Sequence, residues 1–148
     1  SGRGDISRVK IFKKNFSLVD ESYNSNPLSL KTALKNFDSI SANNSQKHLI
    51  LGDMLELGKH SKKLHIEISK SINGTSIDSV NIIGKHIKNT YKNLNNSKKG
   101  LILKKNSQII NLIKNDINNN DYLMIKGSNS TGLHKIANDI KTGKINAL

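Results

Sequence analysis

The chain has 148 residues, the length of one ordinary domain, and it contains no cysteine, which excludes a disulfide framework, a thiol nucleophile and a cysteine-based zinc site. It has no run of about 18 apolar residues and no signal-peptide pattern, so neither a membrane span nor secretion is indicated. The net charge of +13 suggests nucleic acid as a first partner. However, only Arg3 and Arg8 are arginine and 4% of the residues are aromatic, whereas base recognition and stacking favour those residue types.

Short apolar runs alternate regularly with stretches of helical periodicity along the chain. Strands are expected at residues 9–12, 16–20, 47–51, 78–83, 99–103 and 121–126. Helices are expected at residues 27–40, 60–73, 85–94, 106–117 and 131–141. In the second of these helices, Leu64, Ile68 and Ile72 repeat at i+4 and form one apolar face.

From residue 16 onward, each expected strand is followed by an expected helix. This alternation predicts right-handed crossovers and a parallel sheet that is covered by helices on both faces. The first two strands are separated by the short segment at residues 13–15, which predicts a hairpin and therefore one antiparallel edge strand. The expected fold is α/β, a Rossmann-like open and mostly parallel sheet of about six strands flanked by helices, in which ligands bind beyond the carboxyl ends of the strands.

The first loop at such a strand end begins the stretch DESYNSNPLSLKTAL, residues 20–34. Pro27 suits the first turn of a helix, and Asn26 is a candidate N-cap. Asp20, at the end of its strand, could accept hydrogen bonds from ribose hydroxyls, from an amine or from a metal-bound water. An alternative is that the acid and the amides only cap and turn the chain. Tyr23 and Asn24 are more than a cap requires, which favours a binding site.

The second loop is LGDMLELG, residues 51–58, in which two glycines and two acids follow an apolar strand. Such a turn can approach a ligand closely, and Asp53 and Glu56 offer carboxylates to a cationic amine or a metal. Alternatively, these acids only favour the positive end of the following helix. His60 and His65 do not have the i, i+4 spacing of a helical zinc pair, which argues against metal ligation by histidine.

The third loop is KGSNSTG, residues 126–132, which leads into a helix. A glycine and hydroxyl residues at a helix N-terminus can form an anion cradle, although ordinary serine or threonine capping produces the same pattern. The loop is not a Walker A motif, because Gly132 is followed by Leu133 rather than by lysine.

Together and in this order, the three loops resemble the DDSYNANP, LGDMxELG and LVKGSRSxxM motifs of the Mur ligase family, in the branch that joins D-alanyl-D-alanine to UDP-N-acetylmuramoyl-tripeptide. The opening Gly2-Arg3-Gly4 is similar to the turn by which the family enters its C-terminal domain. The resemblance runs over about residues 2 to 141. The chain departs from the family pattern at Glu21, at Ser25 and at His134, where the family commonly has an acid.

The resemblance implies that residues 1–148 are a single Mur ligase C-terminal domain and a fragment of a longer enzyme. The enzyme would use ATP and Mg²⁺ in peptidoglycan precursor synthesis, through an acyl-phosphate intermediate. The phosphate loop and the metal ligands would lie in a central ATPase domain, and an N-terminal domain would bind the UDP part of the tripeptide substrate. The isolated domain is therefore expected to be inactive, and the enzyme is expected to be a cytoplasmic monomer.

The resemblance also implies roles for individual residues, none of which is a catalytic residue or a metal ligand in this domain. The ATP contacts would be Arg3, Asp20, Tyr23 and Asn24. The contacts to the D-alanyl-D-alanine dipeptide would be Asn26, Asp53, Glu56, Gly127 and Ser128. Because the dipeptide must attack as a free amine, the carboxylates would orient its nitrogen without holding it as an ammonium.

Two other functions remain open at this point. One is a basic nucleic-acid-binding domain, which the net charge alone would support. The other is a nucleotide-binding or scaffold domain that has kept the fold without ligase chemistry.

Overall fold

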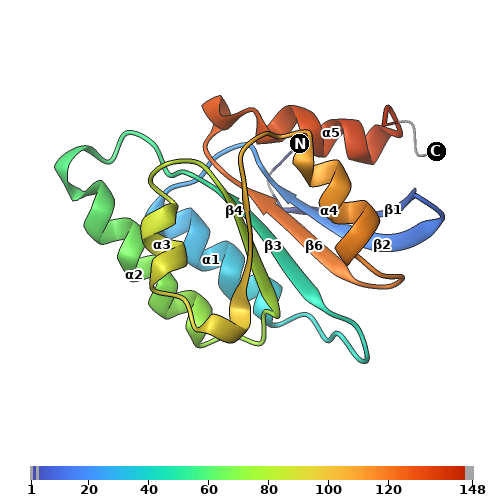
Figure 1. Ribbon diagram of the computed structural model, residues 1–148, viewed down its shortest axis with the longest axis horizontal. Coiled ribbons are helices and arrows are strands. Elements are labelled where there is room, and N and C mark those ends of the chain that lie inside the picture. The colour runs from blue at the N-terminus through green and yellow to red at the C-terminus, as the bar shows by residue number, and fades with distance from the viewer. Residues whose placement is uncertain (1, 3, 146–148) are drawn as a thin grey trace.

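The structure, a computed structural model, describes residue 2 and residues 4–145. The chain forms one six-stranded sheet in the order β1-β2-β6-β3-β4-β5 (Figure 1). The strands are β1 (Asp5–Ile11), β2 (Lys14–Glu21), β3 (Lys47–Gly52), β4 (Ser79–Ile83), β5 (Lys99–Leu103) and β6 (Tyr122–Lys126). The helices are α1 (Pro27–Asp38), α2 (Ser61–Asn73), α3 (Lys88–Lys92), α4 (Gln108–Asp116) and α5 (Leu133–Thr142).

The predicted fold class is confirmed, including the antiparallel edge. β1 pairs with β2 in antiparallel register, and the other four pairs of neighbouring strands are parallel. Phe12 and Lys13 form the hairpin turn with φ values of 53° and 62°, so both central residues of this turn adopt the left-handed conformation.

The helices cover the two faces of the sheet in separate groups. Helices α1, α2 and α3 pack on one face, where Phe37 and Ile72 lie against the alternate strand residues Leu49 and Met124. Helices α4 and α5 pack on the other face, against the residues of opposite parity in the same strands (Leu18, Ile50, Leu123 and Ile125). The two-residue periodicity of the central strands, which are apolar on both sides, thus produces a core on each face.

Strand β6 lies between β2 and β3, and the chain leaves it differently from its neighbours. β2 and β3 lead into α1 and α2 on one face, whereas β6 leads into α5 on the other face (Figure 1). The loops therefore diverge on both sides of the carboxyl end of β6. In open α/β sheets, ligands bind in the crevice at such a switch point.

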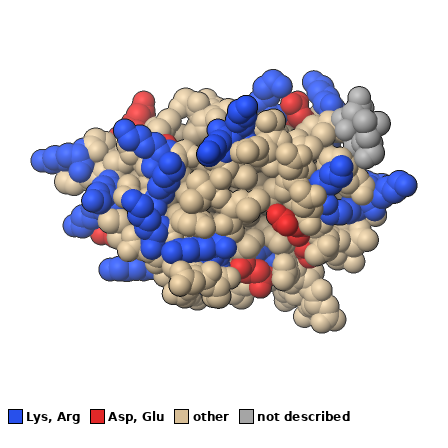
Figure 2. Space-filling view, in the orientation of Figure 1, with Lys and Arg blue, Asp and Glu red and all other residues tan. Residues whose placement is uncertain are grey.

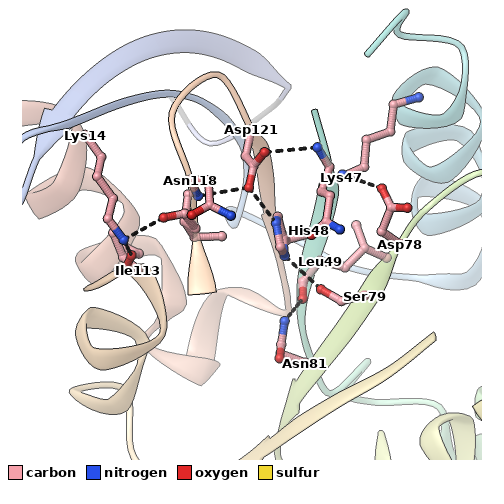
Figure 3. Close-up of polar contacts among 12 residues, drawn as sticks. Lys14, Lys47, His48, Leu49, Asp78, Ser79, Asn81, Ile113, Asn118 and Asp121 are labelled. Carbon is pink, nitrogen blue, oxygen red and sulfur yellow. Dashed lines mark hydrogen bonds and ion pairs between the residues drawn. The ribbon is translucent and has the colours of Figure 1, made fainter. Parts of the chain in front are cut away.

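The amino ends of β3, β4 and β6 are closed by polar side chains, which we call the amino-end network (Figure 3). Asp121 accepts hydrogen bonds from the backbone amides of Gln46 at 3.0 Å and Asn118 at 2.9 Å. His48 lies 3.0 Å from Asp121 through Nε2 and 2.8 Å from Ser79 Oγ through Nδ1. His48 and Asp121 are buried and paired. The network therefore joins β3, β4 and β6 at their amino ends, which lie opposite to the switch point.

Candidate functional site

The three predicted loops meet at the carboxyl ends of β2, β3 and β6. Residues 24–26, 55–57 and 128–130 line one hollow of about 510 Å³, which we call the large hollow. A second hollow of about 240 Å³, the small hollow, is lined by Gly2, Glu21, Tyr23, Asn24, Ser29 and Lys126. Asn24 belongs to both and forms the wall between them.

Ser128 joins the three loops through hydrogen bonds. Its backbone amide donates to the Asp53 carbonyl at 3.2 Å. Its hydroxyl accepts from the Leu55 amide at 2.9 Å and donates to the Ser25 carbonyl at 3.3 Å. Ser128 is 7% exposed, so this hydroxyl lies below the surface of the large hollow and fixes the relative positions of its walls.

Two glycines allow the ends of β3 and β6 to approach each other closely. A Cβ atom on Gly127 would lie 2.7 Å from Leu133 Cδ1, and a Cβ atom on Gly52 would lie 2.8 Å from the same atom. The space that a side chain would need at either position is already filled by Leu133, which packs under both loops. Gly127 therefore shapes the site by lacking a side chain.

Asp53 and Asn26 hold the backbone around the large hollow. The Asp53 carboxylate accepts hydrogen bonds from the amides of Lys85 at 3.2 Å and Ile87 at 2.7 Å, and thereby fixes the loop after β4. Asn26 is the N-cap of α1 and forms a capping box with Ser29, as its predicted cap role requires. Glu56 is exposed at the rim of the large hollow, where it has a φ of 63°.

Asp20, one of the predicted nucleotide contacts, does not line either hollow. Its side chain is 0% exposed and accepts hydrogen bonds from the Ser22 amide, at 3.0 Å, and from the Ser22 hydroxyl. The Lys141 ammonium lies 2.6 Å from Asp20 Oδ2 and also 3.0 Å from Asp5 Oδ2. The close ammonium of Lys141 compensates the negative charge of Asp20 Oδ2. Asp20 thus ties the strand end to α5.

Glu21, the next residue along β2, points the other way and lines the small hollow. Burial raises the pKa of the Glu21 carboxyl, and the nearby Lys126 ammonium opposes that rise. Burial lowers the pKa of Lys126, and the charge of Glu21 opposes that fall. Lys126 donates a hydrogen bond to the Asn24 carbonyl at 2.8 Å, so it also supports the wall between the hollows.

His134 packs against the turn that carries Tyr23. Its ring meets the Tyr23 ring edge-on, with centroids 5.7 Å apart, and its Nδ1 lies 3.2 Å from Ser22 Oγ. The departure from the family pattern at this position therefore places an aromatic contact behind the small hollow.

The predicted site residues divide into three groups. Tyr23 and Asn24 line the small hollow, and Asn24, Asn26, Glu56 and Ser128 line the large one. Asp20, Asp53 and Gly127 lie underneath as support, and Arg3 lies outside the described residues. Glu21 and Lys126 were not predicted as site residues from the sequence. The alternation of side chains along β2 was the available signal for Glu21, since consecutive strand residues face opposite sides.

Other features of the described residues are less specific. No helix in the described part of the chain is long and apolar enough to cross a bilayer. Within residues 4–145, no three histidine or acidic side chains come close enough to hold a metal ion. On the face shown in Figure 2, lysine and arginine side chains are scattered around a central area of other residues and do not form one continuous patch.

Several curated proteins with similar sequences carry the same name. The chain is 32% identical over 135 residues to the UDP-N-acetylmuramoyl-tripeptide–D-alanyl-D-alanine ligase of Rickettsia prowazekii, covering 91% of this chain and 29% of that protein. It is 27% identical over 139 residues to the ligase of the same name from Bacillus subtilis, covering 90% of this chain and 30% of that protein. The chain thus spans less than a third of the length of these relatives.

Solved structures share the fold. A MurF ligase from Thermotoga maritima in complex with ADP matches with a TM-score of 0.77 and 19% identity, over 95% of this chain and 30% of that chain. A MurF structure from Acinetobacter baumannii matches with a TM-score of 0.76 and 21% identity, over 95% of this chain and 30% of that chain. The family model described as "Mur ligase, glutamate ligase domain" matches residues 7–129. The chain therefore belongs to the Mur ligase family.

Proposed function

We propose that this chain is the C-terminal domain of an ATP-dependent ligase that joins D-alanyl-D-alanine to UDP-N-acetylmuramoyl-tripeptide in peptidoglycan precursor synthesis. The observation that carries the proposal is the meeting of the three motif loops around two adjoining hollows at the switch point of the sheet. The names of the relatives support the substrates, and the ADP complex of the Thermotoga maritima ligase supports the nucleotide.

The dipeptide is assigned to the large hollow. Glu56 at its rim offers a carboxylate to the dipeptide nitrogen, and Asn24 and Asn26 offer amide groups to its peptide bond and carboxylate. Ser128, Asp53 and Gly127 contribute by holding the walls in place. Because Glu56 is exposed, it can orient the amine without keeping it protonated.

The nucleotide is assigned to the small hollow, whose described lining includes Tyr23 and Asn24. Of the two neighbouring acids, Glu21 is better placed than Asp20 to accept hydrogen bonds from ribose hydroxyls, because Asp20 is fully buried and occupied by Ser22 and Lys141. Asp20 then contributes indirectly, because it holds the turn after β2 in position. Arg3 remains a predicted nucleotide contact from the sequence alone.

The remaining parts of the reaction are assigned to other domains of the longer protein. The described residues hold no cluster suited to Mg²⁺, so the metal and the phosphate loop would come from a central ATPase domain. Both hollows are open, and closure of that domain over them would exclude water from a reactive acyl phosphate. The isolated chain is therefore expected to show no ligase activity. We also propose that the enzyme is a cytoplasmic monomer.

The test is a ligase assay with the full-length protein, ATP, UDP-N-acetylmuramoyl-tripeptide and D-alanyl-D-alanine. Glu21→Ala should raise the KM for ATP about tenfold, the usual effect of losing a hydrogen bond to a charged group, and should leave the KM for the dipeptide nearly unchanged. Glu67→Ala on α2 is the matched control and should change neither constant. An inactive wild-type enzyme would reject the proposed function, whereas an unchanged ATP KM in Glu21→Ala would reject only the role of Glu21.

A further inference from the structure

Lys126 is a buried cation at the centre of the site that no role described above requires. It is the last residue of β6, between β2 and β3, and its side chain lies at the switch point. It is 3% exposed, which is rare for lysine unless the charge is paired. Its described neighbours nevertheless give it no ion pair, and its hydrogen-bond partner is the uncharged carbonyl of Asn24, at 2.8 Å.

The surroundings of the ammonium leave its charge only partly compensated. Glu21 lines the same hollow and raises the pKa of Lys126, but burial has the larger effect and the pKa of Lys126 is lowered overall. Glu21 is in turn made harder to ionise by burial. A buried ammonium beside an open hollow, without a close carboxylate, is stabilised when an anion enters that hollow.

The donor inventory of lysine permits such a contact without loss of the existing one. An ammonium group has three N–H donors, and the Asn24 carbonyl occupies one of them. The side chain also lines the small hollow, so a ligand there lies beside Lys126.

We propose that Lys126 binds a phosphate oxygen of the nucleotide in the small hollow, while it holds the Asn24 wall. This proposal rests on the proposed function, since it gives a charged contact to the site described above. It makes Lys126 a specificity-determining residue, because a ligand without negative charge would leave the ammonium uncompensated.

The test measures equilibrium binding to the full-length protein by calorimetry, with ADP and D-alanyl-D-alanine titrated separately. Lys126→Met should weaken ADP binding by roughly tenfold to a hundredfold, as expected for the loss of a hydrogen bond to a charged group, and should affect D-alanyl-D-alanine binding much less. Weaker dipeptide binding with unchanged ADP binding would overturn the proposal. Lys126→Arg, which keeps the charge, should recover most of that loss. If Lys126 had a purely structural role, keeping the charge would not restore binding. The matched control is Lys135→Met at an 84% exposed side chain, and it should bind both ligands as the wild type does.

Unchanged ADP affinity in a folded Lys126→Met variant would also overturn the proposal. If that variant does not fold, the Lys126 side-chain NMR signal of the wild type, identified by its loss in Lys126→Arg, gives the answer. It should shift when ADP is added, and a signal that does not respond to ADP would overturn the proposal. Both titrations apply whether or not ligation is observed. Binding with no ligation rejects the proposed function alone, and a wild type that binds neither ligand rejects both.

Discussion

The two ends of the central strands β3 and β6 are built in opposite ways. At the carboxyl ends, Gly52 and Gly127 let the backbones approach each other, and the loops beyond them surround two open hollows. At the amino ends, the buried side chains of His48 and Asp121 join the strands directly (Figure 3). β3 and β6 therefore form a candidate binding site at their carboxyl ends and are held together by side chains at their amino ends.

The difference follows from the direction of the strands. In a parallel sheet, the carboxyl ends release loops into helix N-termini, whose free amides suit anions and polar ligands. The amino ends receive chains from helix C-termini, and here their backbone groups are satisfied by Asp121 and Asp78. Substitutions at the amino ends should thus change stability, and substitutions at the carboxyl ends should change ligand binding.

The largest effect is expected for Asp121→Ala. This change removes the acceptor of the Gln46 and Asn118 amides and leaves His48 buried without its partner. The free energy of unfolding should fall by about 3–5 kcal/mol, because three donors lose their acceptor and each unsatisfied donor in a buried site costs about 1–3 kcal/mol. Urea unfolding of the chain measures it, with Asp116→Ala at an exposed position as the control. A loss similar to that of the control would show that the amino-end network does not hold the strands.

Gly127→Ala should disturb the carboxyl ends of β3 and β6. Its new Cβ atom would lie 2.7 Å from Leu133 Cδ1, so the buried Leu133 side chain or the loop must shift, at a cost of about 2 kcal/mol for overpacking. The same movement should weaken dipeptide binding. Gly74→Ala is the matched control, because its Cβ atom would meet no atom closer than 3.8 Å. Wild-type stability and dipeptide affinity in Gly127→Ala would show that the close approach of the strand ends is not required.

A smaller loss of stability, about 1–2 kcal/mol, is expected for Ser128→Ala, which leaves the half-buried Leu55 amide without its acceptor. Because the walls of the large hollow are then less well fixed, the KM for the dipeptide in the full-length ligase should rise more than the KM for ATP. Ser41→Ala, at an exposed loop position, is the control. A larger rise in the KM for ATP would contradict the assignment of the dipeptide to the large hollow.

The smallest effect is a dependence of stability on pH through His65. His65 Nε2 accepts a hydrogen bond from the Met54 amide at 3.1 Å, and Nδ1 lies 2.8 Å from the Ser61 carbonyl, so the neutral ring fits this site. Burial lowers the pKa of His65. The charge of Asp53 opposes this fall, and the charge of His86 adds to it. The unfolded state, with a pKa near 6.5, therefore binds the proton first as the pH falls.

The contribution of His65 to stability is thus complete above about pH 6.5 and is lost as the pH decreases below that value. Urea unfolding at pH 7.5 and pH 5.5 measures the loss. It should be smaller in His65→Gln than in the wild type or in His60→Gln, an exposed control. Equal losses in all three proteins would exclude His65 as the source.

The sequence predicted the elements well because apolar periodicity is a local property, but the extent of α3 depends on distant residues. Residues 85–94 were expected to be helical, whereas α3 spans only Lys88–Lys92. The amides of Lys85 and Ile87 instead donate to the Asp53 carboxylate, which lies more than 30 positions away in the sequence. A local pattern carries no information about such a partner.

The site was predicted at the level of loops better than at the level of side chains. The positions of the three motifs after three strands predicted their convergence, because parallel strands place their carboxyl ends at one edge. The choice between Asp20 and Glu21 depended on which side of β2 faces Lys141 in α5. Lys126 was missed because lysine is usually exposed, and its burial results from the position of β6 between two neighbours.

The division between a binding end and a cohesive end is tested most directly by hydrogen exchange of the full-length protein, with and without ADP plus D-alanyl-D-alanine. The prediction is slower amide exchange at residues 21–26, 53–57 and 127–131, which line or support the hollows, and no change at residues 46–48 and 118–121 in and around the amino-end network. Protection at the amino ends with none at the carboxyl ends would contradict the account.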